Sequence, residues 1–178
     1  MSTWRPRRSP SSRFSREEIE EHWAHYQKVA RRCGPAGDWT ELCDLYTEDA
    51  TMIVSGGVKV GGREAMKRWY REALGEEPMR SLHYYPVEWY MIDEYLGWVS
   101  CRFNVRMSDP GDGSIHEEYC FSLLKYAGNG LWSHEEDLYN PTKLMSMVDR
   151  WIAAKKKVDP SWDPSQEVGG DPYRTTED

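Results

Sequence analysis

The chain has 178 residues, enough for one domain with tails, and a formal net charge of −7. The negative charge argues against nucleic acid as the main partner, because binding to phosphates needs a basic surface. No apolar stretch approaches the length that crosses a bilayer, so no membrane partner is expected.

Aromatic and sulfur-containing residues add two further expectations. Nine Trp and eleven Tyr stand against three Phe. Because Trp and Tyr combine an apolar body with a polar tip, they suit a semi-polar pocket or a subunit interface. The cysteines are widely spaced and form no Cys-x-x-Cys motif, and the N-terminal arginines are followed by no apolar segment. We therefore expect a cytoplasmic protein with reduced, mostly buried thiols at Cys33, Cys43, Cys101 and Cys120.

The N-terminal part of the sequence predicts a flexible arm followed by a helix. Residues 1–14 are rich in Ser, Arg and Pro and are expected to form the arm. Ser15 is a good N-cap, and Glu17 and Glu18 place negative charge in the first turn, where it suits the helix dipole. Apolar residues then recur at helical spacing, so the first helix is predicted to run to about Arg32.

Two shorter helices and a strand are predicted next. The run 33–37 contains Gly and Pro and is expected to end the first helix. Asp38 is predicted to cap a short second helix, which leads into a strand at 51–54. After a glycine-rich connection, a third helix is expected from Gly62 to about Gly75.

The second half of the sequence predicts a meander of long antiparallel strands. Pro86 marks an edge or a bulge in the first of them. The run 109–113 is a strong turn, and Asn129-Gly130 is the best short hairpin signal in the chain. Helices followed by strands indicate an α+β domain, with the strands expected at 80–92, 96–107, 115–126 and 131–139.

The C-terminal part of the sequence predicts a last helix and a tail. Asn140-Pro141 is expected to start the helix, which covers 142–157 and ends in three lysines that suit the negative end of its dipole. The helix could close the mouth of a pocket or pack on a second subunit. Residues 158–178 are rich in Asp, Pro and Gly and are expected to form a disordered acidic tail.

The order of these elements resembles the nuclear transport factor 2-like superfamily. The runs 38–51 and 61–70 carry the resemblance, which covers about residues 15–141. That superfamily includes SnoaL-type cyclases, ketosteroid isomerases, limonene epoxide hydrolases and scytalone dehydratases. The resemblance implies a cone-shaped α+β barrel, with three N-terminal helices against a curved antiparallel sheet. Because one scaffold hosts many chemistries, it predicts a pocket more strongly than a reaction.

His83 is the first candidate for catalysis. The run Ser-Leu-His83-Tyr-Tyr-Pro resembles a strand of scytalone dehydratase in which the histidine is the general base, a role that suits a pKa near neutrality. The family base is paired with an Asp on the first helix. Here that stretch has no Asp, so Tyr26 or His25 would take its place. A structural histidine bonded to a backbone carbonyl is the alternative.

Arg102 and Asp137 form a second constellation. The runs Cys-Arg102-Phe-Asn104 and Glu-Asp137-Leu-Tyr-Asn-Pro resemble limonene epoxide hydrolases, in which an arginine bridges two carboxylates that activate water and protonate an epoxide. Asn104 stands at the acid position and cannot give up a proton, and Met52 and Val54 stand where the family holds the water. The family mechanism of epoxide hydrolysis is therefore not expected.

Strand alternation bears on the direction of these side chains. A two-residue turn at 128–130 places Asp137 on the same face as Cys120 and Ser122. Odd-numbered residues from Val99 to 105 form the apolar stripe of their strand, which would leave Arg102 in solvent. If Arg102 instead faces the cavity, its guanidinium needs a carboxylate, and Asp137 is the obvious partner.

Two other chemistries find weaker support in the sequence. The general-base and oxyanion-hole Asp residues of ketosteroid isomerases fall on Val54 and Ser122, so isomerisation by that mechanism is not expected. His22 and His25 lie three residues apart, but the spacing of a four-ligand metal site is missing. We predict no metal and no cofactor.

The sequence therefore supports two hypotheses. The first is a cofactor-free lyase, isomerase or cyclase that acts by acid–base chemistry on a hydrophobic, oxygenated polyketide-, steroid- or terpenoid-like molecule, with an altered epoxide hydrolase as its runner-up. His83 would be the base, Tyr26 would orient the substrate or donate a proton, and Asp137 with Arg102 would set the electrostatics. The second is a non-catalytic ligand-binding or scaffold dimer.

Homodimerisation is expected through the outer face of the sheet. The predicted substrate contacts are Asn104, Trp23, Met52, Val54, Ser122 and Glu135.

Overall fold

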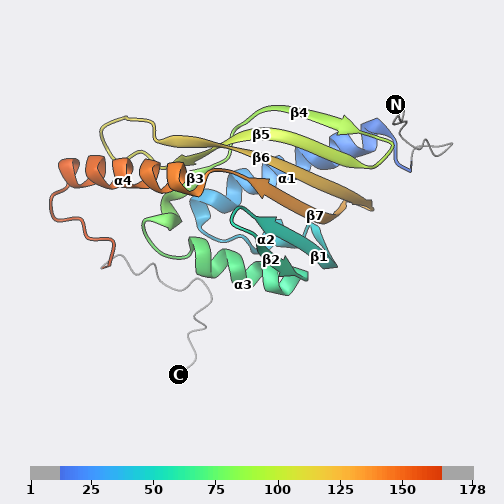
Figure 1. Ribbon diagram of the computed structural model, residues 1–178, viewed down its shortest axis with the longest axis horizontal. Coiled ribbons are helices and arrows are strands. Elements are labelled where there is room, and N and C mark those ends of the chain that lie inside the picture. Colours follow the sequence, from blue (N-terminus) through green and yellow to red (C-terminus); the bar gives the residue numbers. More distant parts are fainter. Residues whose placement is uncertain (1–12, 166–178) are drawn as a thin grey trace, which may run out of the picture.

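A computed structural model describes residues 13–165, which form a strongly curved sheet with helices against its concave face and one helix at its end (Figure 1). The α+β architecture predicted from the sequence is confirmed. The strand order is β2-β1-β7-β6-β5-β3, and β4 also pairs with β5. The strands are β1 (Tyr46–Val54), β2 (Val58–Gly61), β3 (Leu82–Tyr84), β4 (Val87–Asp93), β5 (Trp98–Met107), β6 (Glu117–Gly128) and β7 (Leu131–Leu138).

The first helix, α1 (Arg16–Ala36), is longer than the sequence predicts. Ser15 caps it as expected, by accepting a hydrogen bond from the backbone N–H of Glu18. The helix continues through Pro35 and ends at Gly37, whose left-handed backbone closes the last turn. The predicted end at Arg32 is wrong because the last turn packs against β3, a contact that no local pattern shows.

The next elements place a parallel strand in the sheet. The single-turn helix α2 (Thr40–Cys43) follows α1, and Asp38 accepts a hydrogen bond from the N–H of Thr40. β1 then enters the sheet beside β7 in parallel orientation, whereas the other pairings are antiparallel. β2 lies in the segment that the sequence assigns to a glycine-rich connection. The helix α3 (Arg63–Leu74) has its predicted bounds.

The strand expected at 80–92 is divided. A 3-10 turn, η1 (Met79–Ser81), precedes the short strand β3, and Tyr85-Pro86 separates β3 from β4. Since Pro86 has no N–H to donate, it interrupts the ladder at the place where the sequence predicts an edge or a bulge. The hairpin at Asn129 forms as predicted, with Asn129 and Gly130 at positive φ.

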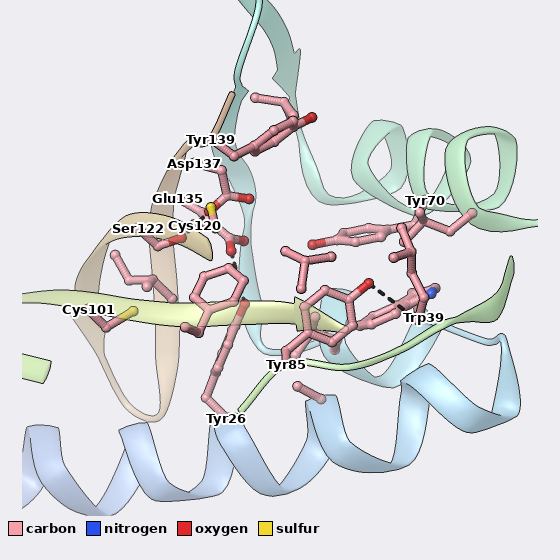
Figure 2. A pocket seen from close by; sticks show the side chains of 18 of the residues that line it. Tyr26, Trp39, Tyr70, Tyr85, Cys101, Cys120, Ser122, Glu135, Asp137 and Tyr139 are labelled. Atoms are coloured by element: carbon pink, nitrogen blue, oxygen red, sulfur yellow. Dashed lines mark hydrogen bonds between the residues drawn. The ribbon is translucent and has the colours of Figure 1, made fainter. Parts of the chain in front are cut away.

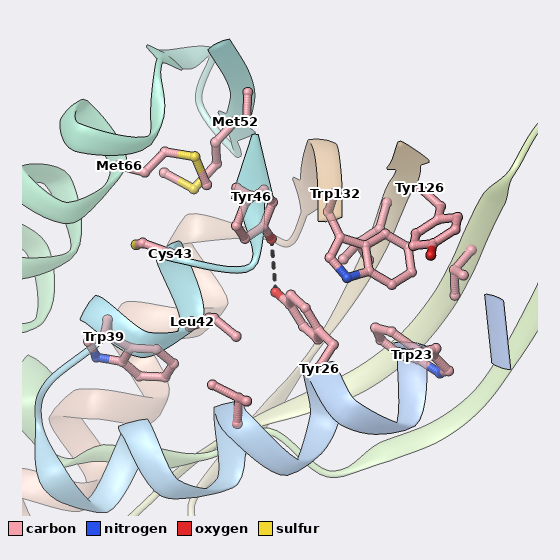
Figure 3. Close-up of a cluster of buried hydrophobic side chains, with 14 of the residues drawn as sticks. Trp23, Tyr26, Trp39, Leu42, Cys43, Tyr46, Met52, Met66, Tyr126 and Trp132 are labelled. Atoms are coloured by element: carbon pink, nitrogen blue, oxygen red, sulfur yellow. Dashed lines mark hydrogen bonds between the residues drawn. The ribbon is translucent and has the colours of Figure 1, made fainter. Parts of the chain in front are cut away.

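Two hydrophobic clusters hold the domain together. The first fills the space between the sheet and α1–α3, where Trp23, Tyr26 and Trp132 pack edge-on or stacked against one another (Figure 3). The second lies between the end of the sheet and the C-terminal helix α4 (Pro141–Val158). Asn140 caps α4 as predicted, by accepting a hydrogen bond from the N–H of Lys143. The four cysteines are buried and free, as expected.

Both ends of the described chain pack more closely than the sequence predicts. Phe14 makes an edge contact with Tyr126, although it falls in the predicted arm. Trp162 falls in the predicted disordered tail, yet it is only 6% exposed and meets Trp151 of α4 edge-on. The rest of both predictions, 1–12 and 166–178, lies outside the described residues. No helix between residues 13 and 165 is long and apolar enough to cross a membrane.

Candidate active site

A cavity of about 180 Å³ lies between α1, α3 and the concave face of the sheet (Figure 2). It is slightly larger than an apolar cavity of about 150 Å³ that holds benzene. Carbon atoms of aromatic and aliphatic side chains form most of its wall. The aromatic residues that line it are Trp23, Tyr26, Trp39, Trp69, Tyr70, Tyr85, Phe103 and Tyr139.

Two carboxylates project into this cavity from one strand. Glu135 and Asp137 stand two residues apart on β7, so both side chains leave the same face of the sheet. Figure 2 shows them on one side of the cavity, across from Tyr70, Tyr85 and Trp39. Arg31 is the single cationic residue among those that line the described cavity, and it is exposed on α1. The acid pair therefore has no buried cationic partner there.

Glu135 is held by two tyrosines. It is 5% exposed, and the Tyr26 hydroxyl donates to its Oε1 at 3.2 Å while the Tyr46 hydroxyl donates to its Oε2. The two hydroxyl oxygens lie 3.0 Å apart (Figure 3). Burial raises the pKa of Glu135, and the hydrogen bonds from Tyr46 and Tyr26 oppose that rise because they favour the ionised form. Two donors thus stabilise a carboxylate at this position.

Asp137 has a different environment. The hydroxyl of Ser122, its cross-strand neighbour on β6, donates to Oδ1. Burial first, and then the negative charge of Glu135, raise the pKa of Asp137 well above its ordinary value, against the effect of the Ser122 bond. When two carboxylates share an apolar site, one of them retains a proton. Asp137 is the member suited to carry it, since Glu135 has two hydroxyl donors.

Other polar groups complete the wall. Burial raises the pKa of the Cys101 thiol to about 12, so the thiol is protonated and is a poor nucleophile. The Tyr85 hydroxyl donates to the backbone carbonyl of Leu82 at 3.2 Å. Tyr70 is 8% exposed, its oxygen points into the cavity, and it has no hydrogen-bond partner among residues 13–165 (Figure 2). Its hydroxyl is therefore available to a ligand.

Six of the residues predicted to form the site line the cavity. They come from three separate regions of the chain, α1, β1 and the β6–β7 hairpin, which the fold brings together. They are Trp23, Tyr26, Val54, Ser122, Glu135 and Asp137. The register of β6 and β7 pairs Ser122 with Asp137, which confirms the face assigned to them from the turn.

His83 does not line the cavity, so the structure does not support its predicted role as general base. Its neighbour Leu82 faces the cavity, and alternation along β3 turns His83 away. The His83 carbonyl lies under Gly34 of α1, and its ring meets Tyr84 edge-on. Burial, and then the positive charge of Arg80, lower the pKa of His83. The backbone of His83 thus lies where β3 meets α1, and its side chain lies outside the cavity lining.

The predicted pairing of Arg102 with Asp137 is wrong. Arg102 lies on the outer face of β5, where it forms an ion pair with Glu88 and stacks over the ring of Tyr119 at 4.9 Å. Asn104 follows it on the same face. The strand alternation seen in the sequence holds, because Cys101, Phe103 and Val105 line the cavity instead.

Met52 also lies outside the cavity lining. It is buried in the first cluster, to which Met66 of α3 also belongs (Figure 3). Sequence reasoning missed several residues of the site, because their role depends on how α1–α3 cross the sheet. The excess of Trp and Tyr was the available signal. The missed residues are Trp39, Trp69, Tyr70, Tyr85, Phe103 and Tyr139, together with Tyr46 behind Glu135.

No model of a protein family matches this sequence, and no curated protein sequence does. Solved structures do match. One is a protein with a ketosteroid isomerase-like fold from Catenulispora acidiphila, solved with trimethylamine (TM-score 0.55, 14% identity, 76% of this chain and 95% of that one). Another is SalBIII, an epoxide hydrolase/cyclase-like enzyme in pyran ring formation in salinomycin. Its TM-score is 0.54 and its identity 14%, over 71% of this chain and 94% of that one.

A third match is a putative polyketide cyclase from Xanthomonas campestris pv. campestris, with a TM-score of 0.54 and 13% identity over 73% of this chain and 98% of that one. Each of these three matches covers more than two thirds of the present chain. The chain thus has the cone-shaped fold of the nuclear transport factor 2-like superfamily, as the sequence predicts. At these identities the likeness concerns the fold alone.

Proposed function

We propose that this protein is a cofactor-free enzyme that moves a proton on a small apolar, oxygen-bearing substrate, as a lyase, isomerase or cyclase. The observation that carries the proposal is the Glu135–Asp137 pair in an apolar cavity without a buried cation. A carboxyl group with a raised pKa can both give and take a proton near neutral pH. Neighbours with cyclase and isomerase-like folds support the same class.

Asp137 carries the proton in this proposal. In a dehydration, its carboxyl proton goes to the substrate hydroxyl, the C–O bond breaks and water leaves. The Asp137 carboxylate then takes a proton from the adjacent carbon, whose C–H electrons form the new C=C bond. The Glu135 carboxylate, fixed by Tyr26 and Tyr46, favours the positive charge that develops between these steps. In an isomerisation, the Asp137 carboxyl proton goes to one carbon of a C=C bond, and the carboxylate then takes a proton from the carbon beside the other end, so that the double bond moves by one position.

The substrate is proposed to have one ring. The cavity is close in size to one that holds benzene, and its aromatic walls suit a terpenoid- or polyketide-like ring. The epoxide hydrolase mechanism is not favoured, because no buried arginine lines the described cavity, whereas in that family an arginine bridges the two carboxylates. Arg102 instead forms an ion pair with Glu88 on the other face of the sheet.

Turnover of a panel of monocyclic β-hydroxy ketones, enones and terpene epoxides tests this proposal. We expect Asp137→Asn to lower kcat/KM by about 100-fold or more, since it removes the transferable proton and keeps the shape. Glu136→Gln is the matched control, because it removes one charge from the same strand on the opposite face. Equal turnover by Asp137→Asn and the control would reject the role of Asp137.

A non-catalytic ligand-binding protein is the second candidate. It is favoured by the position of both carboxylates on one wall, opposite a wall of Trp and Tyr (Figure 2). Binding of panel members without turnover of any of them would favour this candidate over the enzyme.

A further inference from the structure

The charge balance of the cavity is one-sided. Glu135 and Asp137 bring two carboxylates into it, and the one cation among the lining residues, Arg31, is exposed on α1. The tyrosines satisfy Glu135, whereas the Asp137 carboxylate receives a hydrogen bond only from Ser122 within the described structure. A buried carboxylate without a cationic partner costs free energy that a bound cation recovers. The cavity therefore favours a ligand with positive charge.

The wall opposite the acid pair has the composition of a cation site. Trp39 and Tyr70 stack with ring centroids 5.2 Å apart, and Tyr85 meets Trp39 edge-on at 5.3 Å. Aromatic faces attract cations through their quadrupole, most strongly when water is excluded. Figure 2 shows this wall facing Glu135 and Asp137 across the cavity. A cation between the two sides would contact negative charge on one side and aromatic rings on the other.

Two polar groups in the cavity have hydrogen-bonding capacity that the described residues do not use, and this also favours a cationic ligand. The Tyr70 hydroxyl is buried and aimed into the cavity, and no described residue bonds to it. The second carboxylate oxygen of Asp137 also accepts no hydrogen bond within residues 13–165. A protonated amine offers N–H donors to both oxygens. A carboxylate or phosphate on the ligand would instead meet Asp137 and Glu135 with like charge.

We propose that the ligand of this cavity carries a basic amine, whose ammonium group lies between Asp137 and the aromatic wall of Trp39, Tyr70 and Tyr85. The proposal rests on the pocket of the proposed function and adds the charge of its ligand. It makes the cavity selective for cations over neutral molecules of the same shape.

Proton release accompanies the binding of such a cation. A positive charge favours the ionised form of both carboxyl groups, so the proton shared by the pair leaves when the cation enters. With an amine substrate Asp137 therefore starts as a base: its carboxylate first takes a proton from carbon and then returns that proton to the leaving hydroxyl or to a second carbon, the reverse of the order given for a neutral substrate. The other titratable groups that face the pair come from α1, β1, α3, β5, β6 and the segments after β3 and β7. They are Tyr26, Tyr46, Tyr70, Tyr85, Cys101, Cys120 and Tyr139, which are neutral at pH 7 because burial raises the pKa of each.

Phenyltrimethylammonium and tert-butylbenzene form a matched pair of probes, because they have the same shape and differ by one charge. Isothermal titration calorimetry at pH 7 measures the affinity of the wild-type protein for each. We expect the ammonium compound to bind at least about tenfold more tightly. The preference should weaken in Asp137→Asn, in which only the Glu135 carboxylate and the aromatic wall remain, and should be unchanged in the control variant Glu136→Gln; an undiminished preference in Asp137→Asn would contradict the placement of the ammonium group at Asp137.

Three outcomes separate this inference from the proposed function. Equal binding of both probes, or tighter binding of tert-butylbenzene, would overturn the amine proposal and leave an apolar acid–base pocket intact. A preference for the cation combined with full turnover by Asp137→Asn would support the amine proposal and reject the proposed function. Binding of neither probe at millimolar concentration would overturn the amine proposal.

The second measurement needs no variant. The titration with phenyltrimethylammonium is repeated in two buffers that differ in their enthalpy of ionisation. Because this probe has no proton of its own, any proton released comes from the protein. We expect net proton release at pH 7, and affinity that rises as the pH increases. Binding without proton release would show that no carboxyl group of the pair responds to the cation, and would overturn the proposal.

Discussion

At the scale of single residues, the acid pair is the feature that most affects both stability and chemistry. Glu135 and Asp137 are ionisable groups in an apolar cavity, and their burial opposes their charge. Functional sites often contain groups that would be costly elsewhere in a fold. The tyrosines and Ser122 offset part of that cost by hydrogen bonding. The stability of the protein should therefore depend on pH through these carboxyl groups.

The first stability prediction concerns Asp137→Asn. The folded-state pKa of Asp137 is raised, so the folded protein keeps a proton that the unfolded chain loses near pH 4. Stability should thus fall as the pH rises from about 4 through the folded-state pKa, and then stay level. Asn has no charge to bury. We expect the unfolding free energy of the variant to exceed that of the wild type by roughly 2 kcal/mol at pH 8 and by much less near pH 4.

Urea denaturation from pH 4 to pH 8 measures this difference. Because other groups titrate in the same range, the informative quantity is the difference between variant and wild type. Glu136→Gln should show no such trend, since its side chain lies on the other face of β7. A constant difference between Asp137→Asn and the wild type across the range would contradict a raised pKa at Asp137.

At the scale of elements, the contact between α1 and β3 sets one wall of the cavity. A Cβ atom at Gly34 would lie 2.0 Å from the backbone oxygen of His83. The helix can approach the strand this closely only because Gly34 has no side chain. This contact lies in the last turn of α1, beyond the end at Arg32 that the sequence predicts.

The second stability prediction is that Gly34→Ala destabilises the fold by about 3 kcal/mol, because backbone atoms on both sides must separate. Gly61→Ala on β2 is the matched control, since a Cβ atom there meets nothing within 4 Å. Chemical denaturation of both variants gives the comparison. Similar unfolding free energies for the two would show that α1 and β3 are not in close contact.

At the scale of the whole molecule, the C-terminal segment completes the sheet's end. α4 and Trp162 cover a cluster that includes Leu82, Met107 and Cys120, and Leu144 of α4 reaches the cavity. The indole N–H of Trp151 donates to the carbonyl of Ser108 at 2.7 Å. α4 thus packs on its own chain beside the cavity, and its contact with a second subunit stays a prediction.

The third stability prediction is that Trp162→Ala costs about 3 kcal/mol, because it leaves a void against Trp151. Val158→Ala, at an exposed position nearby, should change the unfolding free energy by less than about 0.5 kcal/mol. Thermal and urea denaturation measure both. If Trp162→Ala lowered the unfolding free energy no more than Val158→Ala does, the segment would behave as the disordered tail that the sequence predicts.

The outer face of the sheet is the other feature at this scale. It exposes large aromatic side chains from β4 and β6, including Trp89, Tyr119 and Phe121. Homodimerisation through this face stays a prediction. Sedimentation of the wild type, and of a variant with charged residues at Trp89 and Phe121, would measure it.

The sequence by itself determined the local features of this protein. Periodicity and capping residues placed α1, α3, α4 and most strands, and the hairpin at Asn129 put Asp137 beside Ser122. Alternation along β5 also favoured the outward direction of Arg102. These features depend on residues a few positions apart, which is the range over which helical and strand periods act.

Only the tertiary structure decided which of the candidate residues meet. It turned His83 away from the cavity, paired Arg102 with Glu88, and brought Trp39, Tyr70 and Tyr85 to face the acid pair. It also placed Tyr46 behind Glu135, although 89 positions separate them. The physical reason is that these contacts depend on how closely α1 approaches β3 and on how β1 enters the sheet beside β7, and neither leaves a periodic signal in the sequence.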